Sequence, residues 1–156
     1  DRLRGNEALF DAQAPLLLIE TRGAEGLRYA LRAAKKKRVW RTLPACRMDG
    51  IRDTAGAGDW CTAGIIASLG RVGPKKLAAS TADVFEAALK KGQAMAAWTC
   101  GYDGARGGMY AVSKEDFEQS ISHILNGTMR PAGPKLKPLA YKNTESTWCN
   151  CCAAAS

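Results

Sequence analysis

A short glycine-containing loop, followed at once by an apolar segment, constrains this chain more than any other feature. Residues 53–59 read Asp-Thr-Ala-Gly-Ala-Gly-Asp, and the apolar segment runs from Trp60 to Leu69. Because Gly56 and Gly58 lack a Cβ, the backbone there can turn tightly and approach a ligand closely. A helix that begins directly behind the loop points its free N–H groups and the positive end of its dipole at the same place. The segment therefore predicts an anion-binding site.

Asp59 stands at the predicted start of this helix. A carboxylate beside a bound phosphoryl group suits a general base that accepts the proton of an attacking hydroxyl. The plainer alternative is an ordinary helix entry in which the two glycines are coincidental. Two further stretches of the chain bear on that choice.

The loop resembles the D-T-x-G-A-G-D signature of the ribokinase-like, or PfkB-type, carbohydrate kinases. Upstream, Thr21–Gly26 is similar to the T-x-G-x-x-G nucleotide loop of that family, and downstream the glycine-rich residues 101–108 follow a predicted helix. The resemblance extends over roughly residues 2–126. It implies an α/β fold that is the C-terminal half of a ribokinase-like three-layer α/β/α sandwich. The first half of the sheet and most sugar contacts would then lie upstream of Asp1 or on a second chain.

The resemblance also implies roles for residues of the loop. Asp59 would be the catalytic base, and the amides of Ala57, Gly58 and Asp59 would hold the charge that develops on the transferred phosphoryl group. Gly56 would shape the turn. The expected activity is ATP-dependent phosphotransfer to a hydroxyl of a small sugar or nucleoside, with ATP and Mg²⁺ as cofactors.

The other two motifs would bind the nucleotide, again by resemblance. Thr21, Gly23 and Gly26 would line its pocket, and the alternative is an ordinary turn between strands. Gly104 would lie near the nucleotide. Gln93 falls where relatives often place a residue against the base, although a solvated helix position is an equal alternative.

A monovalent cation such as K⁺ is a further expectation by analogy. Its oxygen ligands, many of them backbone carbonyls, would come from Asp53, Ala55, Thr99, Tyr102, Gly104 and Gly108. The N-x-x-E metal element of the family is not found, because Asn6 is followed by Glu7 and has Leu9 at the fourth place. The alternative function is therefore a non-catalytic nucleotide-binding or interaction module derived from such a kinase.

Hydrophobic spacing predicts the elements around these motifs. Strands are expected at residues 16–19, 27–32, 39–43 and 109–112, the first of them covered on both faces and the second and third paired as a hairpin. Helices are expected at residues 3–12, 59–69, 83–99 and 114–126. Ser80 and Ser113 are the expected N-caps, and Gly92 in mid-helix indicates close packing.

Length and composition fit one domain with a real core, since the chain has 156 residues and 46% of them are hydrophobic. We expect a kinase-like portion at residues 1–127. Residues 128–156, where periodicity ends and prolines recur, are expected to form an extended or disordered tail. An apolar run of 18 residues is absent from the sequence, so no membrane span is expected.

The formal net charge of +8 favours anionic ligands, nucleotides included. Lys35–Arg38 is expected to be a solvated basic turn, with a nucleic-acid role as the less favoured alternative. Six cysteines in such a composition indicate reduced thiols and a cytoplasmic protein. Cys149, Cys151 and Cys152 are too closely spaced for a usual structural zinc site, so a free or crosslinking tail is expected rather than a metal site.

Overall fold

The computed structural model describes residues 16–32 and 38–127. In chain order, its elements are β1 (Leu17–Thr21), a 3₁₀ turn η1 (Gly23–Glu25), β2 (Leu27–Leu31), β3 (Trp40–Leu43), α2 (Ala57–Gly70), α3 (Pro74–Ala78), α4 (Ala82–Thr99), α5 (Gly107–Ala111) and α6 (Lys114–Leu125). The mixed α/β class expected from the sequence is confirmed. The helix expected at residues 3–12, most of the basic turn and the tail from residue 128 lie outside the described residues.

The three strands form an antiparallel sheet in the order β1-β2-β3. Side chains alternate across it, so Leu27 and Tyr29 of β2 are buried toward the helices. Arg28 lies on the other face, where its guanidinium pairs with Glu20 at 2.6 Å and lies 4.3 Å from the centroid of the Trp40 ring. The pairing of β2 with β3 confirms the expected hairpin.

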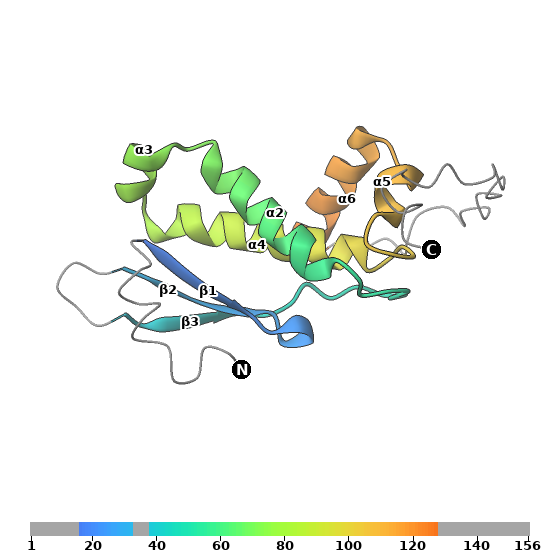
Figure 1. The fold of residues 1–156 in the computed structure, drawn as a ribbon, viewed down its shortest axis with the longest axis horizontal. Helices are drawn as coiled ribbons and strands as arrows, with labels where there is room; N and C mark the ends of the chain where they lie inside the picture. The colour runs from blue at the N-terminus through green and yellow to red at the C-terminus, as the bar shows by residue number, and fades with distance from the viewer. Residues whose placement is uncertain (1–15, 33–37, 128–156) are drawn as a thin grey trace, which may run out of the picture.

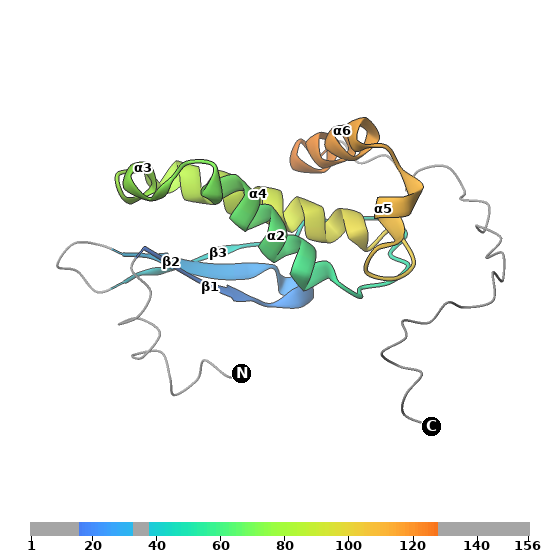
Figure 2. The same ribbon diagram turned by 45° about the horizontal axis from the view of Figure 1, so that its top comes forward.

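Helices α2 and α4 cover one face of this sheet (Figures 1 and 2). Their shared core with the sheet contains Leu27, Tyr29, Cys61, Ile65 and Leu89. The described residues thus build two layers, a sheet and a helical layer. The third layer of a full sandwich stays a prediction.

Glycines allow α2 and α4 to approach closely. A Cβ on Gly92 would lie 2.6 Å from Ile65 Cγ1 and 2.7 Å from the carbonyl oxygen of Cys61, and one on Gly64 would lie 2.6 Å from the sulfur of Met95. Real Cβ atoms do not tolerate such distances, so the absence of side chains sets the spacing of the two helices. The close packing predicted from Gly92 is confirmed.

A second cluster joins α4 to α6 at the other end of the helical layer. Trp98, Tyr102 and Ile121 are buried in it, and Trp60 and Phe117 pack against them. On α6, the expected N-cap is confirmed, because Ser113 Oγ accepts the N–H of Asp116 at 3.1 Å. This cluster holds the C-terminal end of α4 in place, just before the glycine-rich residues 101–108 begin.

Three expectations about the elements are wrong. Residues 109–112 do not form a strand, because Gly108 packs directly on the Trp98 ring and the chain turns into α5, with Met109 N–H bonded to Arg106 O at 3.0 Å. The N-cap of α4 is Thr81, while Ser80 Oγ donates to Lys76 O at 2.9 Å. Strand β1 is half-buried at one edge of the described sheet rather than covered on both faces.

Within the described ranges, none of the helices combines the length and apolar character that crossing a bilayer requires.

Candidate active site

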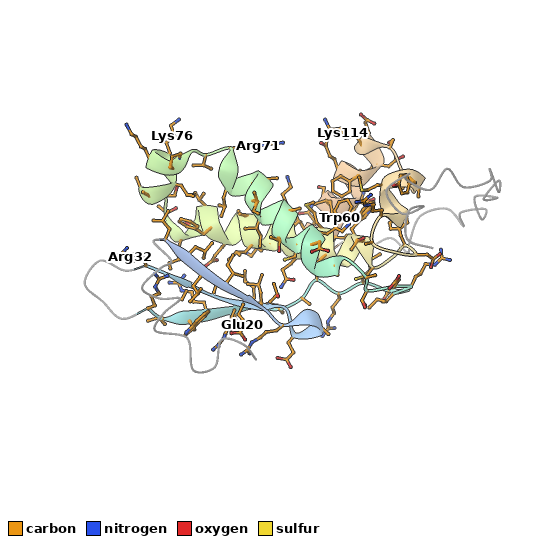
Figure 3. The ribbon with its side chains drawn as sticks, in the orientation of Figure 1. Glu20, Arg32, Trp60, Arg71, Lys76 and Lys114 are labelled. Atoms are coloured by element: carbon orange, nitrogen blue, oxygen red, sulfur yellow. The ribbon has the colours of Figure 1, made fainter. Side chains whose placement is uncertain are left out.

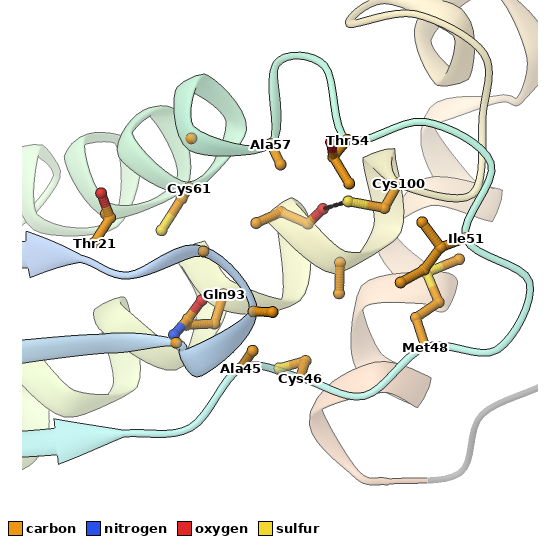
Figure 4. Close-up of a pocket in the computed structure, with 16 residues that line it drawn as sticks. Thr21, Ala45, Cys46, Met48, Ile51, Thr54, Ala57, Cys61, Gln93 and Cys100 are labelled. Carbon is orange, nitrogen blue, oxygen red and sulfur yellow. Dashed lines mark hydrogen bonds between the residues drawn. The ribbon is translucent and has the colours of Figure 1, made fainter.

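A cavity of about 410 Å³ opens between the β1–β2 turn, the segment that follows β3, the first turn of α2 and one face of α4 (Figure 4). Six of the residues predicted to be functional line it: Thr21, Gly23, Gly26, Ala57, Gly58 and Gln93. The structure therefore brings the Thr21–Gly26 turn and part of the 53–59 loop into one space, although 26 residues lie between these two motifs in the sequence.

Backbone hydrogen bonds within the β1–β2 turn hold it in its conformation. The Arg22 N–H donates to Gly26 O at 2.7 Å, and the Gly26 N–H donates to Gly23 O at 3.0 Å. Gly26 has φ +94°, and a Cβ there would overlap the carbonyl oxygen of Leu43. A glycine is thus required at this position by the fold itself. Gly23 has φ +57° and faces open space.

In the first turn of α2 the Ala57 N–H donates to Thr54 O at 3.2 Å, whereas the N–H groups of Gly58 and Asp59 have no acceptor in the helix. Its N-cap is Gly56, with φ 76° and no side chain to accept the free N–H groups. A Cβ at Gly56 would lie 2.5 Å from Ala105 Cβ, whereas one at Gly58 would meet no atom within 4 Å. Asp59, the third helical residue, is exposed. The free amides and the positive end of the helix dipole favour an anion here.

Asp53 lies outside the cavity and ties two loops together. Its Oδ1 accepts the Ala55 N–H at 2.9 Å, and its Oδ2 accepts the Gly104 N–H at 2.9 Å. These backbone donors hold the pKa of the Asp53 carboxyl below its usual value. The carboxylate therefore fixes the 53–59 loop beside residues 101–108.

Gln93 is buried, with 7% of its surface exposed, and lines the cavity from α4. Its Nε2 lies 3.5 Å from Leu43 O, at the limit of a hydrogen bond. The alternative of a solvated helix position is therefore wrong. A buried amide that is so weakly bound within the protein is available to a ligand.

A family model described as pfkB family carbohydrate kinase matches residues 6–111. The chain belongs to the PfkB family of carbohydrate kinases. The matched range contains the β1–β2 turn, the 53–59 loop and residues 101–108, which are the three motifs identified in the sequence. A comparison with curated proteins gives no match.

In this PfkB chain the cation ligands expected from the family are only partly gathered. Asp53, Ala55 and Gly104 meet through the hydrogen bonds above. Tyr102 is buried against Trp98, at 4.8 Å between ring centroids, and Gly108 packs on the same indole. Thr99 is 1% exposed, and its Oγ1 has no hydrogen-bond partner among the described residues. That orphan hydroxyl fits an oxygen ligand, whereas the carboxylate oxygens of Asp53 are already bonded to backbone N–H groups.

For a divalent cation the fit is poorer. The described part of the chain contains no group of three or more His, Cys, Asp or Glu side chains that could hold a metal ion. We therefore assign no protein ligand to Mg²⁺.

Three cysteines also line the cavity, and the sequence analysis assigned them no part in the site. They are Cys46 from the segment after β3, Cys61 from α2 and Cys100 from the end of α4. Burial raises the pKa of all three thiols. Cys61 lies four residues after Ala57 and Cys100 seven after Gln93, so helical spacing from the predicted site could have identified two of them.

Proposed function

We propose that this chain supplies the nucleotide site and the catalytic base of a PfkB kinase that transfers the γ-phosphoryl group of ATP to a hydroxyl of a sugar or nucleoside. The observation that carries the proposal is the single cavity shared by the Thr21–Gly26 turn and the first turn of α2. Its volume of about 410 Å³ falls within the range of about 300–1,000 Å³ that is usual for small-molecule sites.

The nucleotide would occupy the cavity with its phosphates toward α2. Ile51, Ala97 and other apolar side chains offer the surface that a purine requires, and the Gln93 amide can bond an edge of the base. Thr21, Gly23 and Gly26 line the same cavity from the β1–β2 turn. The phosphates would then meet the free N–H groups at the start of α2.

The proposed chemistry uses groups of this same turn. The substrate hydroxyl attacks the γ-phosphorus in line with the departing ADP, and its proton passes to the Asp59 carboxylate. The amides of Gly58 and Asp59 donate to the phosphoryl oxygens as charge develops there, and the Ala57 amide joins them by exchanging its 3.2 Å bond to Thr54 O. Mg²⁺ enters as a part of the ATP substrate, and K⁺, if it binds, would use the Thr99 hydroxyl and neighbouring carbonyls.

The proposal requires a partner. The sugar-binding half would be supplied by a longer chain that includes this one or by a second chain. If that half is present and nucleotide binds without phosphoryl transfer, the alternative holds, namely a non-catalytic module that retains the phosphate loop.

The cavity cysteines provide a direct test of nucleotide binding. Saturating ATP or ADP should slow the alkylation of Cys46, Cys61 and Cys100 by iodoacetamide several-fold, because the ligand fills the space through which the reagent reaches them. Peptide mass spectrometry reads each site separately, with Cys149, Cys151 and Cys152 as internal references. Equal rates with and without nucleotide, on a folded chain, would count against the proposal.

A further inference from the structure

Three consecutive residues of the 101–108 loop contact residues 52–60, the segment that contains the proposed phosphate loop (residues 53–59). The contacts follow the same order along the two segments. The Arg52 guanidinium pairs with the Asp103 carboxylate at 3.0 Å, and the Asp53 carboxylate accepts the Gly104 N–H at 2.9 Å. The third contact is made by Ala105. Its carbonyl oxygen accepts the indole N–H of Trp60 at 2.8 Å.

Trp60 differs from the other two contacts because it belongs to helix α2. Figure 3 shows its side chain on the side of α2 that faces α6, and its ring lies 5.2 Å from the Trp98 ring and 5.9 Å from the Phe117 ring, measured between centroids. The indole is thus held by α4 and α6, while its N–H reaches the loop. The Ala105 side chain in turn packs against the Gly56 backbone at the N-cap of α2.

None of residues 101–108 is among those that line the cavity. The loop instead contacts the outer side of residues 52–60, whose Thr54, Ala57 and Gly58 do line it. A group that acts on the site from this loop must therefore act through the phosphate loop.

We propose that Trp60 is a positioning residue: its indole N–H holds the 101–108 loop against the start of α2, and the loop in turn supports the backbone that binds phosphate. This inference rests on the proposed function. It predicts that a ligand at the first turn of α2 and the order of the 101–108 loop strengthen each other, because thermodynamic coupling between two sites is reciprocal.

Trp60→Phe tests the hydrogen bond with little change in packing, because phenylalanine keeps an aromatic ring beside Trp98 and Phe117 but has no N–H. Hydrogen–deuterium exchange of the ligand-free chain should become several-fold faster in residues 101–108 and remain unchanged in β2 and mid-α4. The ATP dissociation constant should rise about fivefold, the net effect of one hydrogen bond.

Phe117→Leu is the matched control. It removes a ring from the same aromatic cluster and leaves the bond between Trp60 and Ala105 in place. It should lower the melting temperature without selectively accelerating exchange in residues 101–108 or changing the ATP dissociation constant.

Unchanged exchange of residues 101–108 in Trp60→Phe would overturn the inference, and so would a uniform acceleration over the whole chain, which would indicate a purely structural role. A loosened loop with unaltered ATP affinity would also overturn the positioning role. If the wild-type chain binds no nucleotide, the proposed function fails, whereas the exchange in the ligand-free chain still decides whether Trp60 holds the loop.

Discussion

Asp59 combines exposure with a place in the first turn of α2, so it can be changed without disturbing the fold. In a kinase that contains both halves, Asp59→Asn should lower kcat by about 10²–10⁴, the usual contribution of a general base. The ATP dissociation constant should stay constant or fall slightly, because one negative charge near the γ-phosphate is removed. Steady-state kinetics and titration calorimetry measure the two quantities. Unchanged turnover would remove the general-base role.

Gly58 and Gly56 are two residues apart and differ in what surrounds them. Gly58→Ala adds a methyl group where no protein atom lies within 4 Å, and it should preserve or raise the melting temperature, since alanine is the better helix former by about 1 kcal/mol. It should nevertheless weaken ATP binding, because the methyl group occupies the space in which a phosphate approaches the amide.

Gly56→Ala is the comparison variant for this experiment. It places a side chain at φ 76° and within 2.5 Å of Ala105 Cβ, and the left-handed backbone alone costs about 1–2 kcal/mol. Its melting temperature should fall. An ATP affinity in Gly58→Ala equal to that of the wild type would mean that phosphate does not bind at this turn.

Asp53 should make the stability of the chain depend on acid pH. Its folded-state pKa is lowered by the N–H groups of Ala55 and Gly104, so its contribution is complete above the ordinary value of about 3.9 and is lost as the pH falls through the lower folded value. The melting temperature of Asp53→Asn should therefore lie below that of the wild type at neutral pH, and the difference should close in strong acid. A gap that is constant from neutral to acid pH would contradict this assignment.

At the scale of the elements, the crossing of α2 and α4 depends on Gly92. In Gly92→Ala the new Cβ would meet the Cys61 carbonyl at 2.7 Å, and backbone cannot move aside as a flexible side chain can. We expect a net loss of about 1–2 kcal/mol, since overpacking outweighs the gain in helix propensity. Gly70→Ala, where a Cβ meets nothing within 4 Å, should be neutral or stabilising. Thermal unfolding of the two variants decides the point.

The long helices could be predicted because their apolar spacing and boundaries agree. Helix α6 has a serine N-cap, a regular apolar face and Gly127 with φ 67° directly behind it. Helix α5 could not be predicted in the same way. Residues 109–112 are too few to show a period, and the contact of Gly108 with Trp98, which comes from the tertiary structure, decides their conformation.

The candidate site likewise contains residues that the local sequence reveals and contacts that only the tertiary structure reveals. Gly23, Gly26 and Gly56 are recognisable in the sequence because their positive φ values belong to tight turns, whereas Gly58 is recognisable only as part of the motif. The cysteines of the cavity wall and the bond from Trp60 to Ala105 depend on how separate segments pack, which a single sequence does not contain. Gly26 shows the limit most clearly, since the overlap that explains it involves the end of β3.

At the scale of the whole molecule, α6 is the last described element, and we expect the domain to end at residue 127. Ile121 is buried against α4, so α6 itself belongs to the core, and we predict that the core does not depend on the residues after it. Removal of residues 131–156 should leave the melting temperature nearly unchanged and preserve the protection of Cys46, Cys61 and Cys100 by ATP. Thermal unfolding and alkylation of the shortened chain measure both.

Removal of residues 113–156 is the control for that truncation. It takes away Phe117 and Ile121 and exposes the Trp98 ring, which lies 4.7 Å from the Phe117 ring between centroids. Burying each such side chain is worth about 1.5–3 kcal/mol, so this chain should unfold at a much lower temperature. If the shorter deletion also costs several degrees, residues 131–156 pack on the domain, and the boundary at residue 127 is wrong.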